Sequence, residues 1–207
     1  MLTQHCSFKS RKITAIITAA GLSSRMGQLK AMLPWNGTTL ISHQVKILKQ
    51  VGCTEIIVVV GHRSTEITEE LKNEEVIIVN NPNFLEGRAS SINIGITRSD
   101  LDAQCFILLG VDQPRNEFII SKLIDSHFKN RKLITSPRNN GKGGHPVLFS
   151  SELRTELMSV EENDIGLRSI FDKYRNNSLN KVDFFEDLVC LDLNTTQDYE
   201  FNYKKYN

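Results

Sequence analysis

The strongest chemical signal in the sequence is the segment Gly21-Leu22-Ser23-Ser24-Arg25-Met26-Gly27, with Lys30 three residues further on. Glycines at both ends let the backbone bend and expose its N–H groups, as a loop around a phosphate chain requires. Arg25 offers a planar, two-pronged clamp for phosphate oxygens, and Lys30 offers a mobile point charge. The pattern therefore favours a phosphate-binding loop entered through Ala19 and Ala20. The alternative is an ordinary strand-to-helix turn that carries two solvated cations.

Two better-known phosphate motifs do not describe this loop. The two glycines enclose five residues, and no Lys-Ser or Lys-Thr pair follows Gly27, so the loop is not a P-loop. It also lacks the Gly-x-Gly-x-x-Gly spacing of dinucleotide-binding folds.

Oxygen-bearing side chains follow two apolar runs. Asp112 comes directly after residues 105–111, and Asp192 and Asn194 lie at the end of residues 189–193. Carboxylate and amide oxygens are the ligands that Mg²⁺ takes in proteins, commonly together with substrate phosphates. The sequence thus predicts a magnesium site. The alternatives are a turn or helix-start role for Asp112 and a helix N-cap at Asn194 or Thr195.

The elements that must position these residues alternate between β-branched runs and amphipathic stretches, which predicts a parallel α/β fold. The predicted strands are residues 13–20, 55–60, 76–79, 105–111 (placed centrally) and 133–135, followed by 182–185 and 189–193. The predicted helices are residues 39–51, 65–71, 90–98 and 116–128, and a polar helix at the C-terminus. Residues 136–146 are rich in glycine and proline and are predicted to form a long loop. Residues 1–12 form an N-terminal extension and residues 13–207 one domain, whose later third forms a small lobe.

Composition limits the function classes. The chain has 207 residues, 40% hydrophobic and 24% charged, with a net charge of +1, which indicates a globular protein with no overall attraction to nucleic acid. It has no apolar run of about 18 residues and no signal-like N-terminus, so we expect a cytoplasmic protein that binds no membrane. The four cysteines and five histidines show no metal-ligand spacing, which argues against zinc.

The combined motifs resemble the MobA-like NTP transferases, the nucleotidyltransferases of the molybdenum-cofactor group. The resemblance rests on Gly-Leu-Ser-Ser-Arg-Met-Gly-x-x-Lys at residues 21–30, on Leu33-Pro34, and on Asp112-Gln113-Pro114 after a strand. Within the group, Thr18-Ala19-Ala20-Gly21 and residues 144–149 (Gly-His-Pro-Val-Leu-Phe) are similar to the branch of molybdenum cofactor cytidylyltransferases. The guanylyltransferase branch usually has Gly where Ala20 stands, and the extra methyl group favours a pyrimidine base.

The resemblance implies a mostly parallel, Rossmann-like nucleotidyltransferase sheet with helices on both faces and a small C-terminal lobe. It implies that CMP is transferred from CTP to the terminal phosphate of molybdopterin with release of pyrophosphate, with Mg²⁺ as cofactor. The catalytic residues it implies are Arg25, Lys30 and Asp112. The nucleotide-binding residues are Ala19, Ala20, Gly21, Leu22, Ser23, Ser24, Arg25, Gly27, Lys30, Ser90, Ser91 and Asp112. The metal ligands are Asp112 with Asn194 or Asp192, and the acceptor-binding residues are Gly144, His145 and Pro146.

One departure from the family pattern affects the metal site. Many relatives have Asp-x-Asp-Thr-Pro near the C-terminus, whereas this chain has Asp192-Leu193-Asn194-Thr195-Thr196. Asn194 offers an oxygen but no charge, so we expect weaker Mg²⁺ binding.

Other functions remain open at this stage. The same chemistry could act on a sugar phosphate or an alcohol phosphate, or use GTP as in the guanylyl branch. A non-catalytic accessory protein that holds the nucleotide or the finished cofactor is an alternative from another class. The partners implied by the resemblance are CTP, molybdopterin, and a molybdoenzyme or its chaperone.

Overall fold

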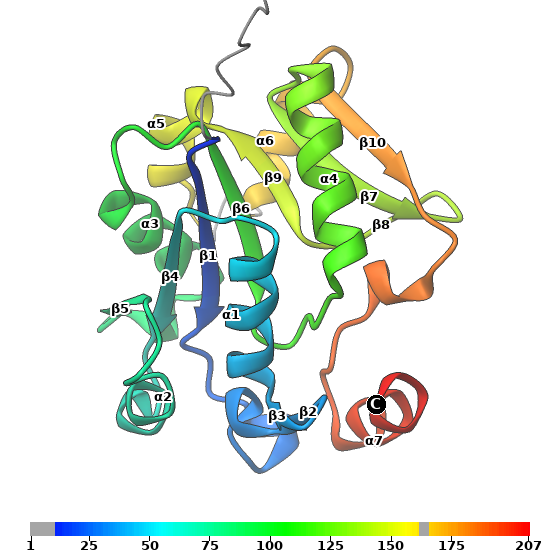
Figure 1. Ribbon diagram of the computed structural model, residues 1–207. Helices are drawn as coiled ribbons and strands as arrows, with labels where there is room; N and C mark the ends of the chain where they lie inside the picture. Colours follow the sequence, from blue (N-terminus) through cyan, green and yellow to red (C-terminus); the bar gives the residue numbers. More distant parts are fainter. Residues whose placement is uncertain (1–10, 162–165) are drawn as a thin grey trace, which may run out of the picture.

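The computed structural model describes residues 11–161 and 166–207. The N-terminal extension predicted over residues 1–12 therefore lies almost entirely outside the described residues. The rest forms one large mixed sheet covered by helices on both faces, with a two-stranded hairpin, β2 (Pro34–Trp35) and β3 (Thr38–Thr39), beside it (Figure 1). The predicted α/β class and mostly parallel sheet are confirmed.

The sheet has the strand order β10-β7-β9-β6-β1-β4-β5, with β8 paired to β7. Its strands are β1 (Ile13–Ala19), β4 (Glu55–Val60), β5 (Ile77–Asn80), β6 (Cys105–Gly110), β7 (Ile134–Asn139), β8 (Lys142–Gly143), β9 (Val147–Ser150) and β10 (Leu179–Asp183). β6 is central, as its uniformly apolar sequence predicts. β1 pairs in parallel with both β4 and β6, so these three strands end at one edge of the sheet, which we call the carboxyl edge.

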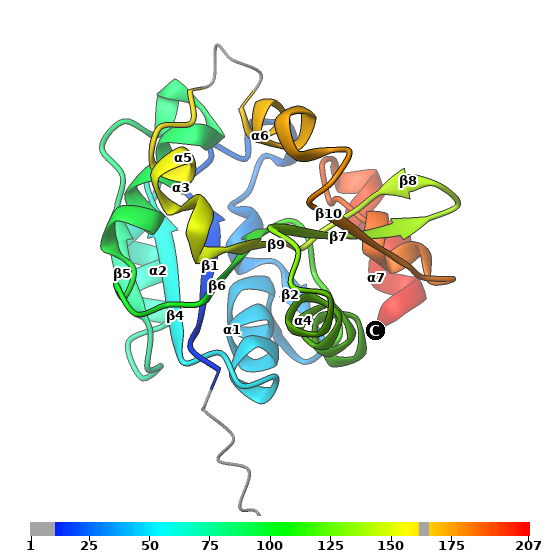
Figure 2. The same ribbon diagram turned by 90° about the horizontal axis from the view of Figure 1, so that it is seen from above.

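The helices divide between the two faces of the sheet (Figure 2). α1 (Leu40–Gln50) and α4 (Glu117–Asn130) cover one face, while α3 (Arg88–Arg98), α5 (Arg154–Met158) and α6 (Leu167–Tyr174) cover the other. α2 (Ser64–Glu70) adds Ile67 to the apolar layer under α1. Alternate residues of β1 face opposite layers, since Ile17 packs with the α1 layer and Ile16 with the α3 layer.

The loop prediction for residues 136–146 is wrong. β7 continues to Asn139, turns at Asn140-Gly141 and returns as β8. Both turn residues have positive φ (49° and 77°), as a tight hairpin turn requires, and Asn-Gly is the residue pair that accepts this conformation most readily. β9, which the sequence analysis did not predict, then runs antiparallel between β6 and β7.

The strand prediction for residues 189–193 is also wrong. This segment begins inside a 3₁₀ helix, η6 (Asp187–Cys190), and continues without entering the sheet. Within it Val189 and Leu193 are buried, but Leu191 between them is only half-buried, so the burial does not follow the two-residue repeat of a strand. Val189 instead uses its carbonyl oxygen to receive hydrogen bonds from His145 N (2.9 Å) and Arg115 Nη2 (3.0 Å).

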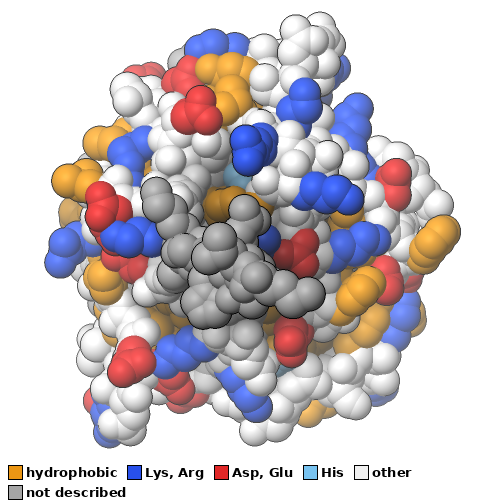
Figure 3. Space-filling model, turned by 45° about the horizontal axis from the view of Figure 1, so that its top comes forward, with side chains coloured by type: hydrophobic (Ala, Val, Ile, Leu, Met, Phe, Trp, Pro, Cys, Tyr) orange, Lys and Arg blue, Asp and Glu red, His pale blue; other side chains and the backbone are white. Residues whose placement is uncertain are grey.

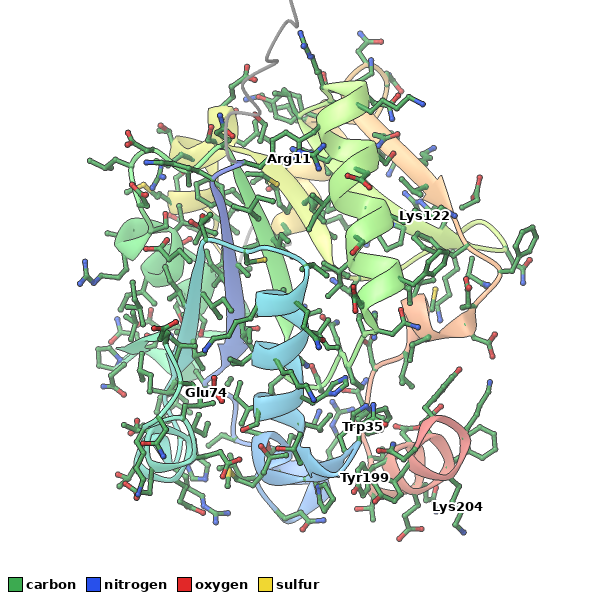
Figure 4. All side chains as sticks on the ribbon, viewed as in Figure 1. Arg11, Trp35, Glu74, Lys122, Tyr199 and Lys204 are labelled. Carbon is green, nitrogen blue, oxygen red and sulfur yellow. The ribbon has the colours of Figure 1, made fainter. Side chains whose placement is uncertain are left out.

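The C-terminal helix α7 (Thr196–Tyr206) is confirmed, and it packs on the β2–β3 hairpin. The Tyr199 hydroxyl donates to Pro34 O at 2.9 Å, and Tyr203 meets Trp35 edge-on with ring centroids 6.3 Å apart. Figure 4 shows Trp35 and Tyr199 facing each other across this junction. α7 thereby ties the end of the chain to the segment that follows the glycine loop.

The surface carries both charge signs. Lys, Arg, Asp and Glu side chains are interspersed over the face drawn in Figure 3, as the net charge of +1 leads one to expect. Among the described residues, no helix has both the length and the apolar character needed to cross a bilayer.

Candidate active site

The glycine loop leaves β1 at the carboxyl edge and folds back on itself. Ser23 has a left-handed backbone (φ 53°), a short 3₁₀ turn η1 (Ser24–Met26) follows, and Gly27 is again left-handed (φ 65°). Met26 is buried and anchors the turn, so the neighbouring residues of the loop are held at the surface. The predicted loop residues Gly21, Leu22, Ser24, Arg25 and Gly27 are exposed, whereas Ala19 and Ala20 are buried beneath them.

Lys30 occupies the centre of the site. It lies in the second 3₁₀ turn, η2 (Lys30–Met32), and only 11% of its side chain is exposed. Its ammonium nitrogen Nζ is 2.9 Å from Asp112 Oδ2 and 3.4 Å from Asn194 Oδ1. Arg25 Nη2 lies 3.4 Å from the same Asn194 oxygen. Residues predicted from three distant parts of the sequence thus meet at one point.

The turn after β6 fixes Asp112. The Gln113 side chain accepts a hydrogen bond from Gly110 N at 2.8 Å, which closes the turn, and a Cβ at Gly110 would lie 2.6 Å from Asp112 Oδ1. Gly110 is therefore the residue that leaves room for the carboxylate. α4 takes Asn116 as its N-cap, so Asp112 is not a helix-start residue.

The segment before α7 presents Asn194 to the same point. Thr195 is the N-cap of α7 and forms a capping box with Asp198, so the Asn194 side chain is not used as a cap. Leu193 N donates to Asp112 O at 2.9 Å, which fixes this segment beside the β6 turn. The Asp192 carboxylate accepts from Gln113 Nε2 at 2.8 Å.

The donor set at this point fits a divalent cation. Asp112 and Asn194 aim oxygens at one positive group, the Lys30 ammonium, so the site already accepts positive charge between them. Among the described residues, no three His, Cys, Asp or Glu side chains gather as a metal site. A metal here would take part of its coordination from substrate phosphates and water, as Mg²⁺ commonly does.

Ser90 and Ser91 lie on a different part of the carboxyl edge. α3 begins at Arg88 with Gly87 as N-cap, so neither serine caps it. Instead, the buried Asn81 amide donates to Ser90 Oγ (2.9 Å) and Ser91 Oγ (3.0 Å), which ties the end of β5 to the first turn of α3. This polar cluster of Asn81, Ser90 and Ser91 lies beyond Gly61, the residue that follows β4. A Cβ added at Gly61 would lie 2.9 Å from the Ala20 methyl group.

The predicted acceptor-binding segment sits beside Val189 and Cys190, which precede Asp192 and Asn194 in the chain. A Cβ at Gly144 would lie 2.0 Å from Val189 O, so only glycine permits this close passage of two backbones. His145 follows, joined to Pro146 by a cis peptide bond. Burial lowers the pKa of His145 to about 3, helped by the nearby cations Arg88 and Arg115, so its imidazole is neutral at physiological pH.

The sequence analysis missed Arg115, which is buried to 2% exposure. Its guanidinium donates to three backbone carbonyls, those of Pro114 (2.8 Å), His145 (2.8 Å) and Val189 (3.0 Å). Burial lowers its pKa to about 10, which still leaves it charged. Arg115 thus joins the β6 turn to the acceptor segment and to the segment that leads to Asn194.

Two further buried amides were missed. Gln44 on α1 donates to Gly110 O (3.1 Å) and Val111 O (2.8 Å), and Asn81 holds the serine pair described above. Gln44 had a sequence signal, since it is a polar residue on the apolar face of its helix, between Ile41 and Leu48. Arg115 had none, because an arginine after a strand is ordinarily exposed.

Known proteins resemble this chain over most of its length. The sequence model of the MobA-like NTP transferase domain matches residues 15–178. The molybdenum cofactor cytidylyltransferase of Escherichia coli (strain K12) is 37% identical over 139 residues, which are 67% of this chain and 70% of that protein. The nicotine blue oxidoreductase of Paenarthrobacter nicotinovorans is 28% identical over 197 residues, which are 91% of this chain and 92% of that one.

Solved structures show the same fold. Rv0371c from Mycobacterium tuberculosis H37Rv superposes with a TM-score of 0.80 at 23% identity, covering 94% of this chain and 99% of that one. The complex of Rv0371C with manganese has a TM-score of 0.71 at 21% identity, covering 93% and 98%.

Proposed function

The chain belongs to the MobA-like NTP transferase family and is a nucleotidyltransferase, and from this premise we propose that it transfers CMP from CTP to the terminal phosphate of molybdopterin. The cytidylyltransferase named above, at 37% identity, supports the choice of nucleotide and acceptor. The observation that carries the proposal is the meeting of Lys30, Asp112 and Asn194 beside the glycine loop.

The triphosphate of CTP lies in the glycine loop in this proposal. The exposed residues from Gly21 to Gly27 offer backbone N–H groups, and Arg25 and Lys30 neutralise the β- and γ-phosphates. Lys30 needs only to turn from Asp112 toward the phosphates, because its ammonium already lies at the mouth of the loop. Ala20, Ser90 and Ser91 lie toward the ribose and base, and Gly144, His145 and Pro146 toward the acceptor.

The reaction is an in-line substitution at the α-phosphorus. An oxygen of the acceptor's phosphate forms a bond to this phosphorus, the bond to the β-bridging oxygen breaks, and pyrophosphate leaves with that bond's electron pair. A phosphate monoester is already an oxyanion near neutral pH, so no side chain needs to act as general base. Arg25 and Lys30 stabilise the charge that develops on the leaving pyrophosphate, and catalysis is chiefly positioning and charge stabilisation.

Asp112 and Asn194 are the residues that hold a divalent ion, with Asp192 as the alternative to Asn194. When bound, Mg²⁺ supplies a positive charge next to the α-phosphate. The manganese complex of the mycobacterial protein supports the use of a divalent cation by this fold.

The test is thermal unfolding with CTP, GTP, ATP, UTP and NADH, each with and without Mg²⁺. A ligand at about 100 times its Kd stabilises the folded state by about 2.7 kcal/mol, which raises Tm by roughly 5–10 °C in a chain of this size. We expect a Mg²⁺-dependent shift with CTP. A Tm shift with GTP alone supports the guanylyl branch, and a Tm shift with UTP supports a sugar-phosphate acceptor. A shift with NADH alone supports an activity like that of the nicotinovorans relative, and no shift with any nucleotide contradicts the proposal.

Pyrophosphate release then distinguishes an enzyme from an accessory protein. With CTP, Mg²⁺ and molybdopterin, we expect Asp112→Asn to lose at least about 100-fold in turnover, since the proposed metal site loses its carboxylate ligand. The matched control is Asp183→Asn at the exposed end of β10, which keeps full turnover. Equal turnover in wild type and Asp112→Asn contradicts the assignment of Asp112.

A further inference from the structure

β10 forms a free edge of the sheet, and no step described so far uses it. It stands at one end of the strand order and, among the described residues, pairs only with β7 (Figure 1). An unpaired edge presents a row of N–H and C=O groups to which another strand can bond. The residues of β10 therefore decide which strand this edge accepts.

The backbone of β10 directs alternate residues to the free edge. Just past the end of β10, Phe184 N donates to Arg138 O of β7 at 2.8 Å. Because consecutive residues of a strand direct their N–H and C=O groups to opposite sides, the even-numbered residues of β10 bond to β7. The odd-numbered residues offer theirs to the free edge, and these are Leu179, Lys181 and Asp183.

The two charged side chains of β10 lie on one face of the strand. The opposite face is directed at α4, since Asn180 Nδ2 donates to Ser126 Oγ at 2.9 Å and Val182 belongs to the apolar layer under α4. Lys181 and Asp183 alternate with these residues and are exposed. Neither of them forms an ion pair within the described part of the chain. Both charges are thus available to a partner.

The edge is complementary in charge to itself. In an antiparallel pair of two copies centred on Val182, Lys181 of each copy lies opposite the partner's Asp183. Opposite charges in such cross-strand positions stabilise the pair, whereas like charges destabilise it. A pair centred on Lys181 would set two lysines against each other, and one centred on Asp183 two aspartates. The charge pattern therefore favours the register centred on Val182.

An exposed aromatic side chain adds apolar surface at the same edge. Phe185 follows β10 and is fully exposed, and the register centred on Val182 brings it level with the partner's Leu179, which is half-buried. Covering such apolar surface favours association. At the other end of the sheet, the apolar side chains of β5 are already half-buried, so that edge has less to gain.

One contact within the chain competes with pairing. Lys122 Nζ donates to Asp183 O, one of the free-edge carbonyls, at 2.9 Å. A carbonyl oxygen has two lone pairs, so it is able to accept a second hydrogen bond from the partner strand. The paired strands are also short. We therefore expect a reversible dimer rather than a permanent one.

We propose that β10 pairs in antiparallel fashion with β10 of a second copy of this chain, so that a two-fold dimer shares one continuous sheet. β9 and β7 separate β10 from β6, whose end carries Asp112, so each copy keeps its own complete candidate active site. The inference is independent of the proposed function, because it uses none of the residues assigned to the nucleotide, the metal or the acceptor.

Analytical ultracentrifugation of the full chain from about 1 to about 500 µM tests the proposal, because association depends on concentration. We expect the wild type to dimerise with a Kd on the order of 10–100 µM. Lys181→Asp and Asp183→Lys each set like charges opposite one another and should weaken the dimer at least about tenfold. An equimolar mixture of these two variants should associate as the wild type does, since every carboxylate of one then faces an ammonium of the other.

The matched control is Lys204→Asp on α7, which changes the net charge as Lys181→Asp does. Lys204 is exposed and lies far from β10 (Figure 4), so we expect this variant to dimerise as the wild type does. A wild type that stays monomeric over the whole range overturns the proposal. So does an undiminished dimer in Lys181→Asp, or an equal loss in Lys204→Asp. Failure of the mixture to associate also overturns it, whereas recovery in the mixture shows that both variants are folded.

Discussion

Lys30 is an internal cation at the point where a metal is proposed to bind. Its ammonium contacts the oxygens of both Asp112 and Asn194, so a divalent ion has to displace it. In the proposed reaction, a triphosphate draws the lysine away and supplies the missing metal ligands at the same time. We therefore expect metal binding and nucleotide binding to be coupled through this one side chain.

This coupling predicts opposite effects of Lys30→Met on binding and on catalysis. Without the competing ammonium, we expect the affinity for Mn²⁺ in the absence of nucleotide to rise about tenfold, a change of about 1.4 kcal/mol. Turnover should fall at least about 100-fold, because the charge on the leaving pyrophosphate loses its partner. Electron paramagnetic resonance of free Mn²⁺ measures the first effect. Lys49→Met on α1, far from the loop, is the control, and weaker Mn²⁺ binding in Lys30→Met contradicts the coupling.

Individual site residues differed in how well the sequence predicted them. The sequence analysis predicted Lys30 from the glycine spacing and Asp112 from its place after a strand, which are local features. It predicted Asn194 from its place after residues 189–193, which are not a strand in the structure. Arg115 was not, because its role depends on three carbonyl groups from segments far apart in the sequence. Local patterns identify groups that face a ligand more readily than groups that hold the backbone behind them.

At the scale of elements, Arg115 joins the β6 turn, the acceptor segment and η6. Each of its three hydrogen bonds goes to a backbone carbonyl, and all three carbonyls belong to segments that lie outside the paired strands. The buried guanidinium therefore helps to set the positions of His145 and Asn194 relative to Asp112, together with the hydrogen bond from Leu193 N to Asp112 O.

We expect Arg115→Met to lower the free energy of unfolding by about 3 kcal/mol, since buried carbonyls lose charged donors. Arg115→Lys keeps the charge but not the three-way geometry, and should recover part of the stability and little of the turnover. Urea denaturation and pyrophosphate release measure the two effects. Arg131→Met, at the exposed end of α4, is the control. Full turnover in Arg115→Lys shows that charge alone suffices and contradicts the positioning role.

Element types were predicted where the hydrophobic repeat is long and missed where the backbone turns tightly. The parallel strands and α1, α3 and α4 follow directly from their repeats. The sequence analysis assigned the β7–β8 hairpin to a loop because the segment is rich in glycine and proline. The pair Asn140-Gly141 is itself a hairpin signal. Residues 189–193 have the apolar composition of a strand. They lie against Gly144 and Arg115, however, and do not join the sheet.

At the scale of the whole molecule, two histidines of the described residues, His43 and His127, are buried, and a third, His145, is half-buried. Burial lowers the pKa of His127 to about 4 and that of His145 to about 3, and it also lowers the pKa of His43. The unfolded chain protonates its histidines near pH 6.5, so below that pH it binds more protons than the folded protein does. Stability is therefore full above about pH 6.5 and is lost as the pH falls toward 4.

We expect the free energy of unfolding to decrease between pH 6.5 and 5 by up to about 1.4 kcal/mol per pH unit for each of His127 and His145, and the lowered pKa of His43 acts in the same direction. Urea midpoints at pH 7.5, 6.5, 5.5 and 5 measure this slope. His127→Gln removes one titrating group distant from the site and should make the slope shallower. A slope that is the same in the wild type and His127→Gln contradicts the assignment.

The overall architecture was predictable because alternating strands and helices leave few ways to build a parallel sheet. The antiparallel strand β9 was not predictable, because four residues are too few to show a clear hydrophobic repeat. Its direction depends on where the chain returns after the β7–β8 hairpin.

The spacing of the site along the chain bears on the order in which the protein is made. Lys30 finds its carboxylate partner 82 residues later and its amide partner 164 residues later. Domains are synthesised from the N-terminus and begin to fold as they emerge. A chain interrupted before residue 190, by stalled translation or by a protease, retains the glycine loop and most strands of the sheet but has no Asn194. In the proposed reaction such a fragment keeps Arg25, Lys30 and Asp112 but lacks the amide oxygen that completes the metal site, so we expect it to hold nucleotide and turn it over slowly, as a competitor of the full chain.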